Sequence, residues 1–219
     1  SMNNSIIIFL VLLFIGSIIL VIRKRKKWIK KFRDSRAKKF AKPLTNFSIT
    51  YVKGERLKNK IALVTGAGKG IGRAIAKRFA GEGAKVLINA RTRTDLESLE
   101  AEIKSEKGDC HIFVGDVTNP KIVREMFAEL SSCYGAPDIC VNSAGTARFG
   151  FVQNFPVEDF QKIMNLNVNS IYNCIQEAVK LMEKNGNQGK IITIGSIASH
   201  WSERGGSGAY TASKYAVYG

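Results

Sequence analysis

Short apolar runs alternate with amphipathic stretches along the chain from residue 60 onward. The apolar runs are rich in Val and Ile and have the length of buried strands, whereas the amphipathic stretches repeat their apolar positions at helical spacing. This alternation predicts an α/β domain over residues 57–219, built on a doubly wound parallel sheet with helices on both faces. Strands are predicted at residues 60–65, 85–90, 110–115, 138–142 and 190–195, and helices at 70–80, 94–106, 119–133, within 156–184 and from near Tyr210.

The first apolar run of the chain is different in kind. Ile6–Ile22 is seventeen residues long and carries no charge; as a helix it spans roughly 25 Å, the short end of what crosses a bilayer. A cleaved signal peptide would carry its positive charges before the run, and a buried core helix would show a polar stripe; the sequence shows neither. Residues 1–22 are therefore predicted to form a single N-terminal transmembrane helix. Its short length suits the endoplasmic-reticulum membrane, which is thinner than average.

A basic segment follows the predicted anchor and accounts for most of the positive charge. The chain has 34 Lys and Arg against 18 Asp and Glu, a net charge of +16, and residues 23–42 contribute twelve cations and one acid. Cations beside a membrane span stay cytoplasmic, so residues 23–56 are predicted to be a juxtamembrane segment and linker leading to a cytosolic domain. Trp28, Ile29 and Phe32 interleave with the cations, which suits anionic lipid headgroups. Membrane lipids explain this segment, and no nucleic-acid partner is predicted.

Glycines cluster where the first predicted strand meets the first predicted helix. A missing Cβ lets the backbone turn tightly and approach a phosphate, and a helix N-terminus presents free N–H groups and a positive dipole. A glycine-rich turn alone is weak evidence, but this one follows a strand and opens a helix, which predicts a site for a dinucleotide pyrophosphate. The residues predicted to bind the cofactor in this turn are Gly66, Gly68, Lys69, Gly70, Ile71 and Gly72.

Two further motifs, read together with the glycine turn, carry a family resemblance. The sequence Asn142-Ser143-Ala144-Gly145 follows the fourth predicted strand, and Tyr210 and Lys214 form a YxxxK pair. In this order the motifs resemble those of the short-chain dehydrogenase/reductase superfamily over residues 57–219, which implies a Rossmann-like fold and hydride transfer with a nicotinamide cofactor. Ser143 departs from the asparagine that is usual there, in a turn that supports the central strand. The resemblance also implies cofactor contacts for Asp116, Val117, Asn142, Ala144, Gly145, Tyr210 and Lys214.

The end of the second predicted strand bears on which nicotinamide cofactor binds. An NAD site places a carboxylate there to accept from the ribose hydroxyls, but this strand is followed by Arg91-Thr92-Arg93, with no acid before Asp95. A guanidinium suits a dianionic 2′-phosphate, and Lys69 is placed to reach the same group. NADP-dependent members of the superfamily often carry these two cations. NADP(H), bound in part by Arg91, is therefore predicted; the alternative is that the arginines belong to a solvated face.

Tyr210 and Lys214 are predicted to be the reacting pair. They lie four positions apart on a helix and share a face, and a nearby ammonium stabilises a phenolate, which suits general acid/base catalysis. By resemblance, Lys214 also holds the nicotinamide ribose, Ser196 steadies the substrate oxygen, and Asn167 completes a catalytic tetrad by holding a water linked to the lysine. The less favoured alternatives are Ser199, Ser202 and Ser207 for the serine, and Asn165 and Asn169 for the asparagine.

Cysteine and histidine do not suggest another chemistry. The four cysteines show no CxxC pairing, which favours a reducing compartment over a disulfide framework. His111 and His200 have no second ligand at a suitable spacing, so no metal site is predicted.

Taken together, the sequence predicts a membrane-anchored, NADP(H)-dependent oxidoreductase that reduces a carbonyl or oxidises a secondary alcohol. The membrane location favours a hydrophobic, lipid-like substrate, and the family resemblance allows a homo-oligomer. The alternative is a nucleotide-binding membrane scaffold or sensor without turnover. Because the last predicted helix has only one or two turns before Gly219, we expect the catalytic domain to be truncated at this end.

Overall fold

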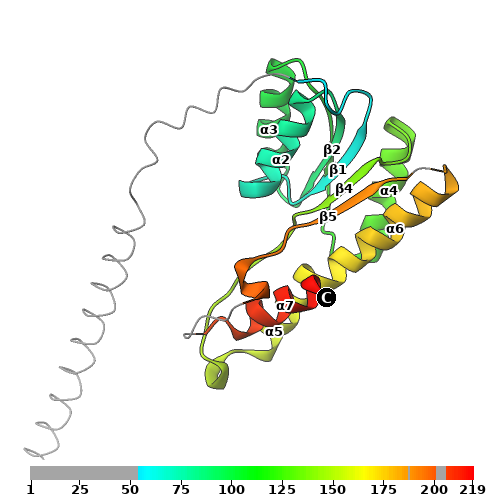
Figure 1. Ribbon diagram of the computed structural model, residues 1–219. Coiled ribbons are helices and arrows are strands. Elements are labelled where there is room, and N and C mark those ends of the chain that lie inside the picture. The colour runs from blue at the N-terminus through cyan, green and yellow to red at the C-terminus, as the bar shows by residue number, and fades with distance from the viewer. Residues whose placement is uncertain (1–53, 187, 201–205) are drawn as a thin grey trace, which may run out of the picture. The chain divides into compact units, whose positions relative to one another are not determined.

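The computed structural model describes residues 54–186, 188–200 and 206–219 (Figure 1). The predicted transmembrane helix at 1–22 and all but the last three residues of the predicted segment at 23–56 lie outside the described residues. Among the residues that are described, no helix is long and apolar enough to cross a membrane.

A five-stranded parallel sheet forms the centre of the domain, in the order β3-β2-β1-β4-β5. The carboxyl ends of the middle strands are level, because Thr65 pairs with both Asn89 and Asn142. The strand order reverses between β1 and β4, and in such sheets ligands bind outside the carboxyl ends of the strands at this switch point. The predicted doubly wound fold is therefore confirmed. The strands are β1 (Ile61–Thr65), β2 (Lys85–Ala90), β3 (Asp109–Val114), β4 (Ile139–Asn142) and β5 (Lys190–Thr193).

Two hydrophobic cores lie on opposite faces of the sheet. Successive side chains of a strand point to opposite faces, so Val64 packs into one core and Leu63 into the other. The first core is closed by α2 (Gly70–Gly81) and α3 (Arg93–Ser105), and the second by α4 (Pro120–Cys133) and α6 (Ser170–Lys184) (Figure 1). The almost continuous apolar character of the strands follows from this burial on both faces.

The long helix predicted within 156–184 is interrupted. The structure has α5 (Val157–Met164), a π-helical turn at Asn165–Asn169, and then α6. A π-helical turn inserts one extra residue into a helix and is common at functional sites. Here it directs Asn167 into the interior of the protein, where the side chain is completely buried. Apolar periodicity alone did not predict this break.

The last helix begins earlier and is longer than predicted. Helix α7 (Gly208–Tyr218) has eleven residues, about three turns, so the prediction of one or two turns was wrong. It packs against α5 and against the short 3-10 turn η3 (Ile197–Ser199), while a second 3-10 turn, η1, covers Val152–Asn154. Because α7 carries the predicted Tyr210 and Lys214, this packing fixes where the reacting pair lies.

The first described residues are attached to the domain by a buried carboxylate. The side chain of Glu82, 3% exposed at the end of α2, pairs with Arg78 and with Arg56, which lies 2.5 Å away. These guanidinium partners, with Arg56 the main one, lower the pKa of Glu82 to about 2. The amide of Gly54 also donates to Gly81. Residues 54–56, predicted as the end of a linker, therefore contact the folded domain.

Candidate active site

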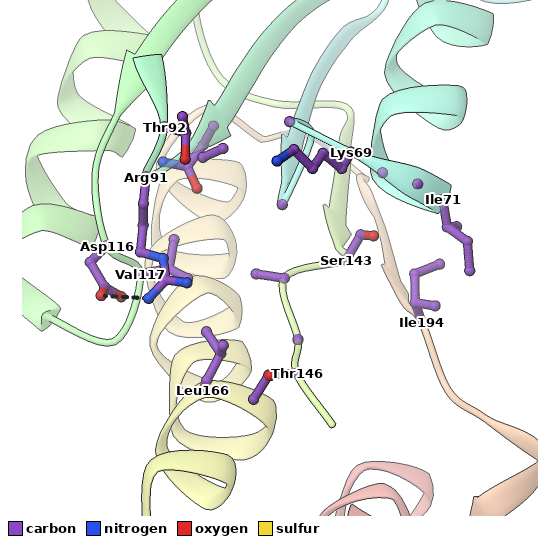
Figure 2. Close-up of a pocket in the computed structure, with 18 of the residues that line it drawn as sticks. Lys69, Ile71, Arg91, Thr92, Asp116, Val117, Ser143, Thr146, Leu166 and Ile194 are labelled. Atoms are coloured by element: carbon purple, nitrogen blue, oxygen red, sulfur yellow. Dashed lines mark ion pairs between the residues drawn. The ribbon is translucent and has the colours of Figure 1, made fainter. Parts of the chain in front are cut away.

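A cavity of about 670 Å³ opens at the carboxyl end of the sheet (Figure 2). Its wall combines the glycine turn after β1, the ends of β2, β3 and β4, and two residues of α7. Segments more than 140 positions apart in the sequence therefore meet in one site. The predicted residues that line the cavity are Gly66, Gly68, Lys69, Gly70, Ile71, Gly72, Arg91, Asp116, Val117, Ala144, Gly145, Tyr210 and Lys214.

The glycine turn is shaped by close contacts that exclude side chains. Gly66 has φ +65°, and a Cβ added there would lie 2.7 Å from the backbone of Ala144. A Cβ on Gly72 would lie 2.4 Å from the carbonyl oxygen of Gly66. Gly70, with φ +59°, faces open space, and its amide belongs to the first turn of α2, whose N–H groups have no helical acceptors. The turn thus offers a smooth, positively polarised cradle that fits a pyrophosphate.

Charged side chains surround the end of the cavity formed by β2 and β3. Arg91 is 71% exposed and its Nη1 lies 3.9 Å from Oδ2 of Asp116, the ion pair drawn in Figure 2. Lys69 is 80% exposed and its Nζ lies 3.3 Å from Oδ2 of Asp95. Asp95 also lines the cavity, although it was not among the residues predicted to bind the cofactor. We refer to Lys69, Arg91, Asp95 and Asp116 as the adenosine-end charges.

Lys214 is held at the opposite end of the cavity by a backbone carbonyl. Its Nζ donates to the carbonyl oxygen of Ile194 at 2.8 Å and lies 5.9 Å from the centre of the Tyr210 ring. Lys214 is only 7% exposed, and burial lowers its pKa from the ordinary lysine value. The ammonium therefore has a fixed position next to the phenol, as the predicted reacting pair requires.

Hydrogen bonds of two buried side chains connect the backbone of Tyr210 to the loop after β4. Oδ1 of Asn167 accepts from the amide of Thr146 at 2.8 Å, and Nδ2 donates to the Thr146 carbonyl at 2.9 Å. Nδ2 also donates to Oγ of Ser213 at 3.0 Å, and Ser213 in turn donates to the carbonyl of Tyr210 at 2.7 Å. We call Thr146, Asn167 and Ser213 the buried network. Thr146 and Ser213 were not singled out from the sequence.

Three predicted site residues do not line the cavity. Asn167 lies behind it in the buried network. Asn142 is buried at the end of β4, and its Nδ2 has no hydrogen-bond partner among the described residues. Ser196 is half-buried at the start of η3, where its Oγ accepts from the amide of Ala198 at 3.1 Å. The roles predicted for these three residues stay predictions.

The alternatives to Ser196 and Asn167 differ from them in accessibility. Ser199 is buried and its Oγ has no partner among the described residues, Ser207 is buried at the start of α7, and Ser202 lies outside the described residues. Asn165 and Asn169 are exposed and hydrogen-bond to each other at 3.3 Å. Asn167 is therefore the asparagine of this turn that faces the interior.

An apolar rim lies beside the reacting pair. The ring of Phe149 meets the ring of Tyr210 edge to face, with centroids 6.2 Å apart. Phe149 is well exposed, and so are Phe151 and Val152 on the same loop between β4 and α5, and Ile197 at the start of η3. We call Phe149, Phe151 and Val152 the apolar rim; Phe149 is the member that contacts Tyr210, and an exposed apolar side chain beside a polar site is typical of a surface that receives an apolar ligand.

The fold, the glycine cradle and the YxxxK pair in one cavity are features shared by the short chain dehydrogenases. The chain matches the short chain dehydrogenase family over residues 60–219, and it belongs to that family.

Relatives within the family differ in what they act on. The chain is 39% identical over 166 residues to a 3alpha-hydroxysteroid dehydrogenase of Mediterraneibacter gnavus, covering 74% of this chain and 65% of that protein. It is also 39% identical over 165 residues to a 2-dehydro-3-deoxy-D-gluconate 5-dehydrogenase of Bacillus subtilis, covering 74% and 63%. A solved short chain dehydrogenase of Burkholderia cenocepacia, in complex with NADP, matches with a TM-score of 0.70 and 32% identity, covering 74% and 65%. The chain thus spans just under two thirds of the length of these proteins.

Proposed function

We propose that the protein is a membrane-anchored, NADP(H)-dependent oxidoreductase that interconverts a carbonyl and a secondary alcohol on a hydrophobic substrate. One observation carries the proposal: Tyr210 and Lys214 line the same cavity as the glycine cradle. A cavity that joins a pyrophosphate site to a tyrosine–lysine pair suits proton transfer beside a bound dinucleotide.

The residues in and around the cavity have different roles in such a reaction. When bound, the nicotinamide cofactor supplies or accepts the hydride. In the reductive direction Tyr210 donates its phenolic proton to the substrate oxygen, and the Lys214 ammonium stabilises the phenolate that remains. The Ser196 hydroxyl donates a hydrogen bond to the same oxygen. Asn167, through Ser213, holds the backbone of Tyr210 in place.

The preference for NADP(H) rests on the adenosine-end charges. Lys69 and Arg91 supply two cations at the end of the cavity that lies away from Tyr210, and cations favour a 2′-phosphate. The related protein from Burkholderia cenocepacia is in complex with NADP, which supports the same choice. Asp116 and Val117 line the cavity beside Arg91 and are the residues we assign to the adenine (Figure 2).

Our proposal of a hydrophobic substrate depends on the apolar rim. Phe149 contacts the Tyr210 ring, so an apolar group carried next to the reacting carbonyl would lie against Phe149, and Phe151 and Val152 are exposed on the same loop. The relative from Mediterraneibacter gnavus acts on a hydroxysteroid, which is of this kind, whereas the gluconate relative names a polar substrate. The rim decides our choice between the two classes.

Location and partners are proposed from the sequence. The apolar run at Ile6–Ile22 and the cations that follow it support a single-pass anchor, in the endoplasmic reticulum, with the catalytic domain in the cytosol. An anchor of this kind would hold the cavity within reach of lipid-like substrates. Membrane lipids are then the partners of the first 42 residues, and the folded domain is able to form a homo-oligomer.

The test compares turnover and cofactor binding in the Tyr210→Phe variant. We expect kcat with a steroid or long-chain ketone to fall about 10²- to 10⁴-fold, because the general acid is lost, while the Kd for NADPH stays within about twofold. The wild-type protein should bind NADPH more tightly than NADH. Unchanged turnover in the variant would remove Tyr210 from the mechanism. Cofactor binding without turnover of any carbonyl in the wild-type protein would favour the nucleotide-binding scaffold instead.

A further inference from the structure

The adenosine-end charges balance one another. Lys69 pairs with Asp95, and Arg91 pairs with Asp116, so this end of the cavity carries two cations and two carboxylates. A 2′-phosphate bears between one and two negative charges at neutral pH and needs uncompensated cations to be favoured. The two cations that favoured NADP(H) in the sequence are therefore partly neutralised in the folded protein, each by a carboxylate from another segment of the chain.

The two carboxylates have different surroundings. Oδ1 of Asp116 accepts from both the amide and the hydroxyl of Thr118, at 2.9 and 2.8 Å, and Oδ2 lies 3.9 Å from Arg91. Asp116 thus belongs mainly to the turn after β3. Asp95 is 24% exposed, lies closer to its cation at 3.3 Å, and packs against the glycine turn, where a Cβ on Gly68 would come within 3.2 Å of it. Asp95 is therefore the acid that pairs with Lys69, the cation that we expect to bind the 2′-phosphate.

We propose that Asp95 is a specificity-determining residue that limits the preference for the phosphorylated cofactor. Its carboxylate competes with a 2′-phosphate for Lys69 and repels that phosphate, whereas a free ribose hydroxyl is able to donate to it. The inference rests on the proposed use of a nicotinamide dinucleotide at this site. If Asp95 acts in this way, the preference for NADPH over NADH is moderate, and the residue that limits it lies in the first turn of α3.

The experiment isolates the adenosine end by using cofactor fragments. Calorimetry on the full chain measures binding of 2′,5′-adenosine diphosphate, which carries the 2′-phosphate, and of 5′-adenosine monophosphate, which lacks it. The variant is Asp95→Asn. The matched control is Glu97→Gln, the same change of charge on the same helix, at a side chain that pairs with Arg93 at 4.0 Å and does not line the cavity.

We expect Asp95→Asn to raise the affinity ratio of the two fragments about tenfold in favour of the diphosphate, and Glu97→Gln to change it by less than about twofold. The gain should shrink as salt is raised, because both cations are exposed. An equal response of the two variants, or a ratio that falls in Asp95→Asn, overturns the inference while leaving fragment binding, and with it the proposed cofactor, intact. Failure of the wild-type chain to bind either fragment overturns the proposed cofactor and this inference together.

Discussion

The two ends of the cavity differ in the burial of their charged and polar side chains. At the adenosine end the charged groups are exposed, as Lys69 and Arg91 are, and they meet their partners across 3.3 and 3.9 Å. At the reacting end Lys214, Asn167 and Ser213 are buried: Lys214 donates to the Ile194 carbonyl at 2.8 Å, while Asn167 donates to Ser213 at 3.0 Å and Ser213 to the Tyr210 carbonyl at 2.7 Å. One end of the cavity thus has exposed, loosely paired charges, and the other has side chains positioned by buried hydrogen bonds.

This difference indicates which properties of the site are easily changed. Exposed ion pairs contribute about 0–1 kcal/mol each and are screened by salt, so altering them shifts ligand preference with little effect on stability. Buried polar groups leave costly unpaired atoms when a partner is removed, so the reacting end tolerates few substitutions. We expect cofactor preference to be adjustable in this fold and the position of Tyr210 to be nearly invariant.

The largest effect that we expect comes from Lys214→Met at the reacting end. The substitution removes the ammonium that lies 5.9 Å from the centre of the Tyr210 ring, so kcat should fall at least about 10²-fold. Methionine keeps the length and packing of the side chain but leaves the Ile194 carbonyl without its donor, so we expect the free energy of unfolding to fall by about 1–2 kcal/mol. Steady-state kinetics and thermal unfolding measure the two effects separately.

Lys180→Met is the control for this change. Lys180 is exposed on α6 and forms an i,i+3 pair with Glu177 at 2.8 Å, far from the cavity lining. Its substitution should leave kcat within about twofold, as is usual for surface positions. Similar kinetics in the two variants would break the contrast between the two ends, since it would mean that the buried ammonium has no special role.

The next effect is on stability and concerns Asn167→Ala in the buried network. Removing the amide takes away the donor to the buried Ser213 hydroxyl and the partner of the Thr146 N–H and carbonyl, and an unsatisfied buried group costs about 1–3 kcal/mol. Thr146 is exposed, so water replaces part of what its backbone loses, and we expect the free energy of unfolding to fall by about 1–3 kcal/mol in denaturant titrations. Asn169→Ala, an exposed position two residues along the same turn, should change it by less than about 0.5 kcal/mol. Equal losses would show that the turn, and not the network, is what the asparagines stabilise.

The fold was predictable because its information is local. Each predicted strand overlaps the observed one to within a residue or two, since strands buried on both faces need near-continuous apolar runs. The π-helical turn was not predictable from apolar periodicity, because the one buried residue of Asn165–Asn169 is the polar Asn167. The early start of α7 was missed as well, since the glycines that precede Tyr210 read as a loop.

Only the site residues that belong to a sequence motif could be predicted. The glycine turn and the pair Tyr210 and Lys214 carry spacings that can be recognised in one stretch of chain. Ser213 and Asp95 carry no such signal, because their importance comes from partners 46 and 26 positions away, Asn167 and Lys69. The residues that follow β2 show Arg91 and Asp95 in the sequence, but the pairing of Asp95 with Lys69 of the glycine turn appears only in the folded protein.

The smallest effect, and the one that sharpens the comparison most, is expected for Arg91→Gln at the adenosine end. The guanidinium is 71% exposed and its contact with Asp116 is long, so its loss should leave the free energy of unfolding within about 0.5 kcal/mol. The same change removes one of two cations available to a 2′-phosphate, and we expect the Kd for NADPH to rise about tenfold while the Kd for NADH moves less than about twofold. Arg93→Gln, an exposed arginine on α3 outside the cavity lining, serves as the control and should leave both constants unchanged. If Arg91→Gln instead lowers stability as Asn167→Ala is expected to, the two ends are coupled, and the adenosine end is part of the same rigid network that holds Tyr210.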